Sequence, residues 1–275
     1  MYKVIASDMD ETFLNGEHAI PAPNVAALRR LHELGVLFVP SSGRGYESIL
    51  HNFRDVDPAL LEGTYVISYN GATINHFGDP EPLLEHHLDH DVADEMWHLG
   101  IERGLGLHAY TPDSRVRVRG CPPDEAAYLA SLKGIEDYPE STLEGLPVVS
   151  KMLFMSHDMD MLHEFAEGEV LPRLAGRADV TYSSGRYLEV IPKGVNKGTG
   201  LEELARLMGI DVAETIGFGD SANDAEMLRA AGLGVGVANV SDEARPSCDL
   251  VLDTCADEGA LAELVERVID PQHEG

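Results

Sequence analysis

The sequence has few cysteines and no long apolar run. Only three of its 275 residues are cysteines, and their odd number and irregular spacing argue against a disulfide framework or a zinc site. No apolar run approaches the roughly 20 residues that a membrane-spanning helix needs. The first residues also lack the pattern of a signal peptide. We therefore expect a cytoplasmic protein with no membrane partner.

Positive charge is also scarce. The chain has 20 Lys and Arg residues against 48 Asp and Glu residues, which gives a formal net charge of −28. Such an excess repels nucleic acid, so we expect no nucleic-acid partner. Any site for a phosphorylated substrate needs local cations, whereas solubility alone explains the overall acidity. The oligomeric state is left open by the sequence, and a monomer is compatible with it.

Apolar strands alternate with helical patterns in the first third and in the last part of the chain. Continuous apolar strands separated by helices are typical of a parallel sheet that is covered on both faces. We therefore predict a doubly wound α/β core made of residues 1–80 and 187–275. Its predicted strands cover residues 3–7, 36–39, 65–68, 215–218, 233–237 and 250–252.

Residues 81–186 have a different pattern. Apolar and polar residues alternate in Ser114–Arg119, which is typical of a strand with one solvated face, usually in an antiparallel sheet. We expect this segment to form an inserted α+β cap domain that selects the substrate. Its predicted helices cover residues 92–103, 123–132 and 159–174.

Two carboxylates, Asp8 and Asp10, follow the first predicted strand. Where a buried strand ends and the chain turns, both can converge on one point. At about 4 Å and an effective dielectric of about 20, two such charges repel by roughly 4 kcal/mol. A cation, a shared proton or a catalytic task would offset this cost. The alternative is a solvated turn, in which Asp is common for local hydrogen bonding.

Other predicted strands also end in polar or flexible residues. Ser42-Gly43 follows the second strand, and Asp220 follows a strand near residue 218, with Asp224 one turn later. Ligands of open parallel sheets bind beyond the carboxyl ends of the strands. Carboxylates gathered at that edge predict an oxygen-ligand site for a hard cation, with Mg²⁺ as the default.

Five segments together resemble the haloacid dehalogenase superfamily, and within it the Cof-type phosphatases with a type IIB cap. The segments occur in the family's order and span nearly the whole chain. One departure is Glu11, where the family usually has Gly, a residue with more backbone freedom. The matching segments are Asp8–Thr12, Ser41–Arg44, Asn70–Ala72, Val195–Gly198 and Gly219–Asp224.

The resemblance implies an Mg²⁺-dependent phosphatase that acts on a small phosphorylated metabolite, such as a sugar phosphate, pyridoxal phosphate or flavin mononucleotide (FMN). Asp8 would be the nucleophile that forms an aspartyl-phosphate, and Asp10 the general acid and base. Mg²⁺ would bind Asp8, the backbone carbonyl of Asp10, and Asp220, while Asp224 would orient a metal-bound water. The implied substrate-binding and phosphate-binding residues are Met9, Thr12, Ser42, Gly43, Lys197 and Asn223.

Two other functions stay open at this point. A phosphomutase or phosphotransferase of the same superfamily would need an acceptor hydroxyl held by the cap. A non-catalytic phosphate-sensing module would need no general acid, so Asp10 argues against it. Within the cap, Arg117 and Lys151 could reach a polar substrate, although surface solvation explains their charge equally well.

Overall fold

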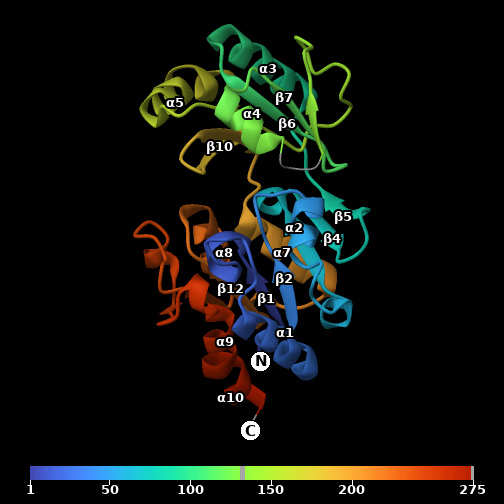
Figure 1. Cartoon of the computed structure of the whole chain (residues 1–275), viewed down its shortest axis with the longest axis vertical. Coiled ribbons are helices and arrows are strands. Elements are labelled where there is room, and N and C mark those ends of the chain that lie inside the picture. The colour runs from blue at the N-terminus through green and yellow to red at the C-terminus, as the bar shows by residue number, and fades with distance from the viewer. Residues whose placement is uncertain (131–133, 274–275) are drawn as a thin grey trace. The chain divides into compact units, whose positions relative to one another are not determined.

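A five-stranded parallel sheet, built from strands of the first and the last part of the chain, lies at the centre of one unit (Figure 1). The computed structural model describes residues 1–130 and 134–273. The strand order is β14-β13-β12-β1-β2, and each neighbouring pair is parallel, as predicted. The strands are β1 (Val4–Ser7), β2 (Leu37–Pro40), β12 (Thr215–Gly219), β13 (Leu233–Gly236) and β14 (Leu250–Val251).

A small antiparallel sheet continues from this one. Ser41 forms a parallel bridge with Ile67, which places the third predicted strand beside β2. The chain then doubles back twice in antiparallel pairings. The strands of this sheet are β3 (Tyr65–Ser68), β4 (Thr73–His76) and β5 (Pro82–Glu85).

Helices cover both faces of the parallel sheet. Side chains alternate between the faces of a strand, so that Ile5 and Val4 of β1 point to opposite sides. Ile5 belongs to a core with residues of α1 and α9, whereas Val4 packs with Leu204 of α7 and Ala6 with Met227 of α8. This arrangement confirms the predicted doubly wound core. Its helices are α1 (Ala22–Leu34), α2 (Tyr46–Asn52), α7 (Lys197–Met208), α8 (Ala225–Ala230), α9 (Ala260–Leu264) and α10 (Asp270–His273).

The register of the parallel strands brings distant polar segments to one edge. Ser7 at the end of β1 lies beside Phe218 of β12 on one side and beside Pro40 of β2 on the other. The residues that follow these three strands must therefore emerge together at the carboxyl edge of the sheet. These are the segments that carry Asp8, Asp220 and Ser42.

A separate six-stranded sheet forms the centre of the middle of the chain. Its order is β10-β11-β9-β6-β7-β8, and its pairings are antiparallel except for the parallel pair β7–β8. The predicted solvated-face strand is β7, whose residues alternate between buried and half-buried. The strands are β6 (Gly106–Tyr110), β7 (Val116–Arg119), β8 (Ile135–Asp137), β9 (Lys151–Met155), β10 (Ala178–Ser183) and β11 (Tyr187–Pro192).

The three predicted helices of this part are present. The helix predicted at 92–103 lies within α3, and the one at 159–174 is α5 followed by a π-helical turn and α6. The helix predicted at 123–132 is α4, although its residues 131–132 lie outside the described part of the chain. The helices are α3 (His90–Arg103), α4 (Pro123–Leu129), α5 (Met159–Phe165) and α6 (Leu171–Leu174).

The register of this sheet assigns side chains to two faces. Ala109 of β6 and Val190 of β11 both pair with Met152 of β9, and all three belong to the core formed with α3 and α5. His108 and Glu189 both pair with Leu153, and so share the opposite face. His108 and Glu189 therefore lie in the middle of their strands, unlike Asp8 and Asp220, which follow strand ends.

The two sheets belong to two compact units, Met1–Glu85 with Asn196–Gly275 and His86–Val195. Both borders lie a few residues later than the limits 81 and 186 predicted for the insertion. The reason is strand pairing, because β5 pairs with β4 of the first unit and β11 pairs with β9 and β10 of the second. None of the helices among the described residues has the length and apolar character that a membrane span requires.

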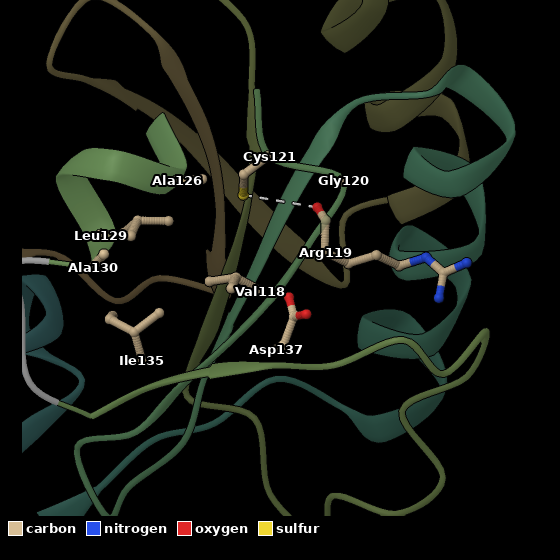
Figure 2. Close-up of a pocket in the computed structure, with 9 residues that line it drawn as sticks. All are labelled: Val118, Arg119, Gly120, Cys121, Ala126, Leu129, Ala130, Ile135 and Asp137. Carbon is tan, nitrogen blue, oxygen red and sulfur yellow. Dashed lines mark hydrogen bonds between the residues drawn. The ribbon is translucent and has the colours of Figure 1, made fainter. Parts of the chain in front are cut away.

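The second unit contains a cavity of about 350 Å³ beside α4, β7 and β8 (Figure 2). Its walls combine apolar side chains, those of Val118, Leu129 and Ile135 among them, with polar atoms, including those of Cys121 and Asp137. None of the predicted site residues lines this cavity.

Candidate active site

Asp8 is fixed at the end of β1. Its N–H donates a 2.8 Å hydrogen bond to the carbonyl of Phe218 on the neighbouring strand. The residue is only 6% exposed, and its carboxylate accepts a short hydrogen bond from Lys197 Nζ. A strand end thus delivers a carboxylate into a buried position with one cationic partner.

Lys197 is the first residue of α7, and its location follows from the cap of that helix. The side chain of Asn196 accepts a 2.9 Å hydrogen bond from the Thr199 N–H, while the Thr199 hydroxyl accepts one from the Asn196 N–H. The fully buried ammonium group donates to Asp8 and, at 2.6 Å, to Asp224. Burial opposes its charge, but Asp224 and Asp8 together raise the pKa of Lys197, which stays protonated.

Asp220 and Asp224 complete the buried group. Asp220 directly follows β12, and its carboxylate accepts a 2.7 Å hydrogen bond from the Thr12 hydroxyl. The Asp224 carboxylate accepts 3.0 Å hydrogen bonds from the N–H groups of Asp220 and Ser221, and its other oxygen accepts from Lys197. Thr12 and Asp224 therefore each hold a neighbour in place.

One carboxylate oxygen from each of Asp8, Asp220 and Asp224 lies within 4.8 Å of the others. Burial raises the pKa of Asp8 well above its ordinary value, although Lys197 lowers it in part. Burial and the nearby Asp224 raise the pKa of Asp220 to about 6. Hard oxygen donors that repel one another are the ligands expected of a site for a divalent cation.

Asp10 lies apart from this group. Its carboxylate is 2.9 Å from His18 Nδ1 and 3.0 Å from Arg44 Nε, and its side chain is 36% exposed. The sequence led us to expect mutual repulsion between Asp8 and Asp10. The carboxylates that lie close together are instead Asp8, Asp220 and Asp224, because Asp10 extends from the turn toward the Arg44 guanidinium and the His18 imidazole.

The loop after β2 places Ser42 and Gly43 at the same edge of the sheet. Ser42 is 2% exposed, and its hydroxyl accepts a 3.2 Å hydrogen bond from the Arg44 N–H. Its backbone carbonyl accepts from the Asn70 N–H at 2.9 Å. A Cβ atom on Gly43 would lie 3.1 Å from Asn70 Oδ1, so glycine permits this close approach.

The remaining predicted residues have diverse positions. Met9 is completely buried in the core of the first unit, so its main chain is the part that could contact a phosphate. Thr12 is also buried and bonds to Asp220. Asn223 is half-buried, and its amide oxygen accepts a 2.7 Å hydrogen bond from the Ser221 hydroxyl.

Glu11 occupies a backbone conformation that favours glycine. Its φ is 61° and its ψ is 12°, in the left-handed region. The exposed residue keeps this conformation with its carbonyl accepting a 2.8 Å hydrogen bond from Asn239 Nδ2. The departure from the usual family motif therefore leaves the turn in place, at the cost of backbone strain.

Three residues with contacts at the site were not given roles from the sequence. Arg44 belongs to the motif Ser41–Arg44, which places it near the site, but the motif does not show that it contacts Asp10. His18 has no sequence signal that links it to Asp10. Asn70 also belongs to a quoted motif, and its buried Oδ1 has no hydrogen-bond partner among the described residues.

A family model for haloacid dehalogenase-like hydrolases matches residues 5–264. A protein of Serratia proteamaculans named HMP-PP phosphatase is 30% identical over 245 residues, which are 87% of this chain and 85% of the relative. A Bacillus subtilis protein named putative phosphatase YxeH is 27% identical over 251 residues, covering 88% of this chain and 90% of the relative.

Solved structures agree with this result. The crystal structure of a haloacid dehalogenase-like hydrolase from Bacteroides thetaiotaomicron is similar over 98% of this chain and 100% of the other, with a TM-score of 0.83 and 26% identity. The names of the relatives agree with the enzyme class implied by the motifs. The chain belongs to the haloacid dehalogenase-like hydrolase family.

Proposed function

We propose that this hydrolase is an Mg²⁺-dependent phosphatase that hydrolyses small phosphomonoesters through an aspartyl-phosphate on Asp8. The observation that carries the proposal is the buried group of three carboxylates and Lys197 at the carboxyl edge of the parallel sheet. Names of the relatives support the same class of reaction. Sugar phosphates, pyridoxal phosphate and FMN are the substrates to test first.

The donor set fits Mg²⁺, which takes oxygen ligands from one or two carboxylates. Asp8, Asp220 and the backbone carbonyl of Asp10 would hold the ion. Both oxygens of Asp224 already accept hydrogen bonds from protein groups, which supports a role in orienting a water of the ion. When bound, the ion supplies positive charge that reduces the repulsion between the nucleophile and the phosphate.

The first step forms a bond between a carboxylate oxygen of Asp8 and phosphorus. As that bond forms, the bond between phosphorus and the leaving oxygen breaks. Asp10, in its protonated form, gives its proton to the leaving oxygen, which departs as an alcohol. The fixed backbone of Asp8 beside Phe218 supports this role, because a nucleophile must be held in line with its target.

The second step removes the phosphoryl group. Asp10, now a carboxylate, accepts a proton from a water molecule whose oxygen bonds to phosphorus. The bond between phosphorus and Asp8 then breaks, which restores the Asp8 carboxylate and releases inorganic phosphate. Asp10 regains its proton in this step, so the cycle closes without another reactant.

Cations and neutral donors near Asp8 would bind the phosphoryl oxygens. Lys197 contributes a buried positive charge, and Ser42 and the Gly43 N–H come from the adjoining strand end. The main chain of Met9 and the side chain of Asn223 would add further contacts. Thr12 would act through Asp220, because its hydroxyl bonds to that carboxylate.

The second unit would select the leaving group, since the core residues serve every phosphomonoester alike. The two cationic residues singled out there differ in position. Arg117 pairs with Ala109 on the helix-covered face and lies 3.2 Å from Glu136. Lys151 pairs with Tyr110 on the other face and is bound to Glu189. Lys151 is buried together with its partner, so Arg117, whose side chain is 15% exposed, is the more accessible candidate for a specificity residue.

The deciding experiment is turnover of p-nitrophenyl phosphate with Mg²⁺, followed by a panel of phosphorylated metabolites. We expect release of p-nitrophenol and inorganic phosphate in equal amounts. Added sugars test for a phosphotransferase, which would move the phosphoryl group to their hydroxyls instead of to water. Binding of phosphate without any turnover would contradict the proposal.

The three cysteines form no disulfide, which supports a cytoplasmic location.

A further inference from the structure

Both oxygens of the Asp10 carboxylate contact a cationic or potentially cationic side chain. His18 Nδ1 lies 2.9 Å from Oδ1, and Arg44 Nε lies 3.0 Å from Oδ2. We propose that Arg44 and His18 are positioning residues that hold the Asp10 carboxylate in its working orientation. This inference rests on the proposed function, in which Asp10 transfers protons.

Arg44 approaches Asp10 from a well-anchored loop. Its N–H donates to the Ser42 hydroxyl at 3.2 Å, and its carbonyl accepts from the Tyr69 N–H at 3.0 Å. The Nε and Nη2 atoms are shielded from solvent and make no aligned hydrogen bond among the described residues. The contact with Asp10 is therefore an ion pair, directed from the same loop that carries Ser42.

His18 approaches from a second, separate segment. Its N–H donates to the Asn15 carbonyl at 2.9 Å, and its carbonyl accepts from Asn52 Nδ2 at 3.1 Å. Its φ is 57°, a conformation that non-glycine residues adopt only when their surroundings compensate for the strain. The side chain is 70% exposed, so this contact with Asp10 is the more weakly held of the two.

Two contacts fix a carboxylate in a way that one contact cannot. A single partner leaves rotation about the last side-chain bond free, whereas partners on both oxygens restrict it. Exposed ion pairs contribute little to stability, so stability alone gives little reason for the arrangement. Orientation matters much more for proton transfer, since a misplacement of about 1 Å can reduce a rate by about a hundredfold.

The test compares substrates that need the proton of Asp10 with one that does not. An alkyl phosphate has a poor leaving group and needs protonation as its bond to phosphorus breaks, whereas p-nitrophenolate leaves readily without it. The variants are Arg44→Gln and His18→Gly, because glycine tolerates the φ of 57°. Arg54→Gln is the matched control, since Arg54 is exposed and pairs with Asp55 at 3.2 Å.

We expect Arg44→Gln to lower kcat/KM for the alkyl phosphate at least tenfold more than for p-nitrophenyl phosphate. His18→Gly should show the same preference with a smaller ratio of about threefold. In both variants, kcat should fall and phosphate should accumulate on Asp8, because Asp10 also serves the second step. Arg54→Gln should change neither ratio nor accumulation.

Equal losses for both substrates, or no loss in either variant, would overturn the inference. Because His18 is exposed, His18→Gly keeps the test decisive even if Arg44→Gln fails to fold. Failure of the unaltered enzyme to hydrolyse p-nitrophenyl phosphate would instead overturn the proposed function, and this inference with it. The parent enzyme therefore distinguishes the two failures before any variant is measured.

Discussion

The two units differ in how the charges around a buried lysine are balanced. In the first unit, three carboxylates gather around one ammonium group, that of Lys197. In the second unit, Lys151 faces Glu189 at 2.6 Å, with each side chain 4% exposed. The first group carries surplus negative charge, whereas the second is a matched pair.

The difference separates a reactive site from a structural contact. A matched buried pair offsets its own desolvation, at least in part, and needs no further partner. An unmatched group remains costly until a cation joins it, which is why perturbed carboxylates are concentrated at functional sites. The surplus charge around Lys197 therefore supports the proposal that the chemistry occurs in the first unit.

The largest effect is expected from Asp8→Asn. An amide has nearly the same shape as a carboxylate but cannot attack phosphorus, so kcat should fall at least about a thousandfold. Thermal unfolding should show no loss of stability, because the change removes one of three repelling charges. Turnover within tenfold of the parent, measured with p-nitrophenyl phosphate, would remove Asp8 from its role as nucleophile.

Metal removal should have the next largest effect. EDTA should reduce turnover about a hundredfold or more, and Mg²⁺ should restore it, while Ca²⁺ should support little turnover because its coordination is looser. Asp220→Ala should raise the Mg²⁺ concentration for half-maximal activity at least tenfold. Asp253→Ala is the control, since that side chain is 96% exposed. Full activity in metal-free buffer would contradict the metal site.

Glu189→Gln makes the same carboxylate-to-amide change in the matched pair. It removes the negative charge of Glu189 from beside the buried Lys151 ammonium and should lower the free energy of unfolding by about 3–5 kcal/mol. The double variant Lys151→Met with Glu189→Gln should recover much of that loss. Urea unfolding measures both. A stability loss from Asp8→Asn as large as that from Glu189→Gln would erase the contrast between the units.

Acid should destabilise the protein in part through His108. Burial, with Lys151 and Arg186 nearby, lowers the pKa of His108 to about 3. Below pH 6.5, the ordinary pKa of histidine, His108 is protonated in the unfolded chain but stays neutral in the folded protein. The free energy of unfolding therefore falls as pH drops from 6.5 toward 3. At pH 4.5 the contribution is about 2–3 kcal/mol.

The matched measurement is the pH dependence of urea unfolding in the parent and in His108→Gln. The variant cannot take up this proton and should lose less stability between pH 7 and pH 4.5. Identical slopes in the two proteins would show that His108 does not contribute to the acid sensitivity. Glu125 lies 3.7 Å from His108 Nε2, so both proteins are measured in the same buffers at each pH.

The smallest effect is expected from Glu11→Gly. Glycine relieves the cost of the left-handed conformation at φ 61°, although it also gives the unfolded chain more freedom. The net gain in the free energy of unfolding should be about 0.5–1 kcal/mol. Glu17→Gly, at a position without positive φ, should destabilise slightly. A loss of stability in Glu11→Gly would show that the glutamate is favoured there for another reason.

Much of the first unit could be predicted from the sequence. Apolar runs marked the strands, and parallel strands expose their carboxyl ends at one edge, so Asp8 and Asp220 could be placed together. The contacts of Asp10 could not be predicted in this way. They depend on the turn at His18 and on the direction of the Arg44 side chain, for which the chain has no periodic signal.

Less of the second unit could be predicted, for a physical reason. Arg117 and Lys151 look equivalent as charges in strand patterns, yet they lie on opposite faces of the sheet. The face depends on the register between strands, which distant segments establish on folding. Lys151 and Glu189 lie on different strands, β9 and β11. No sequence motif at either residue predicts that the two side chains meet.

The proposed covalent bond between Asp8 and phosphorus can be trapped and located in the sequence. Asp10→Asn should slow removal of the phosphoryl group, so p-nitrophenyl phosphate with Mg²⁺ should leave phosphate on the protein after rapid quenching. Borohydride reduction followed by peptide mass spectrometry would then convert Asp8, and no other aspartate, to homoserine. Hydrolysis without any trapped phosphate would show that Asp8 is not the nucleophile. Conversion of a different aspartate to homoserine would show the same.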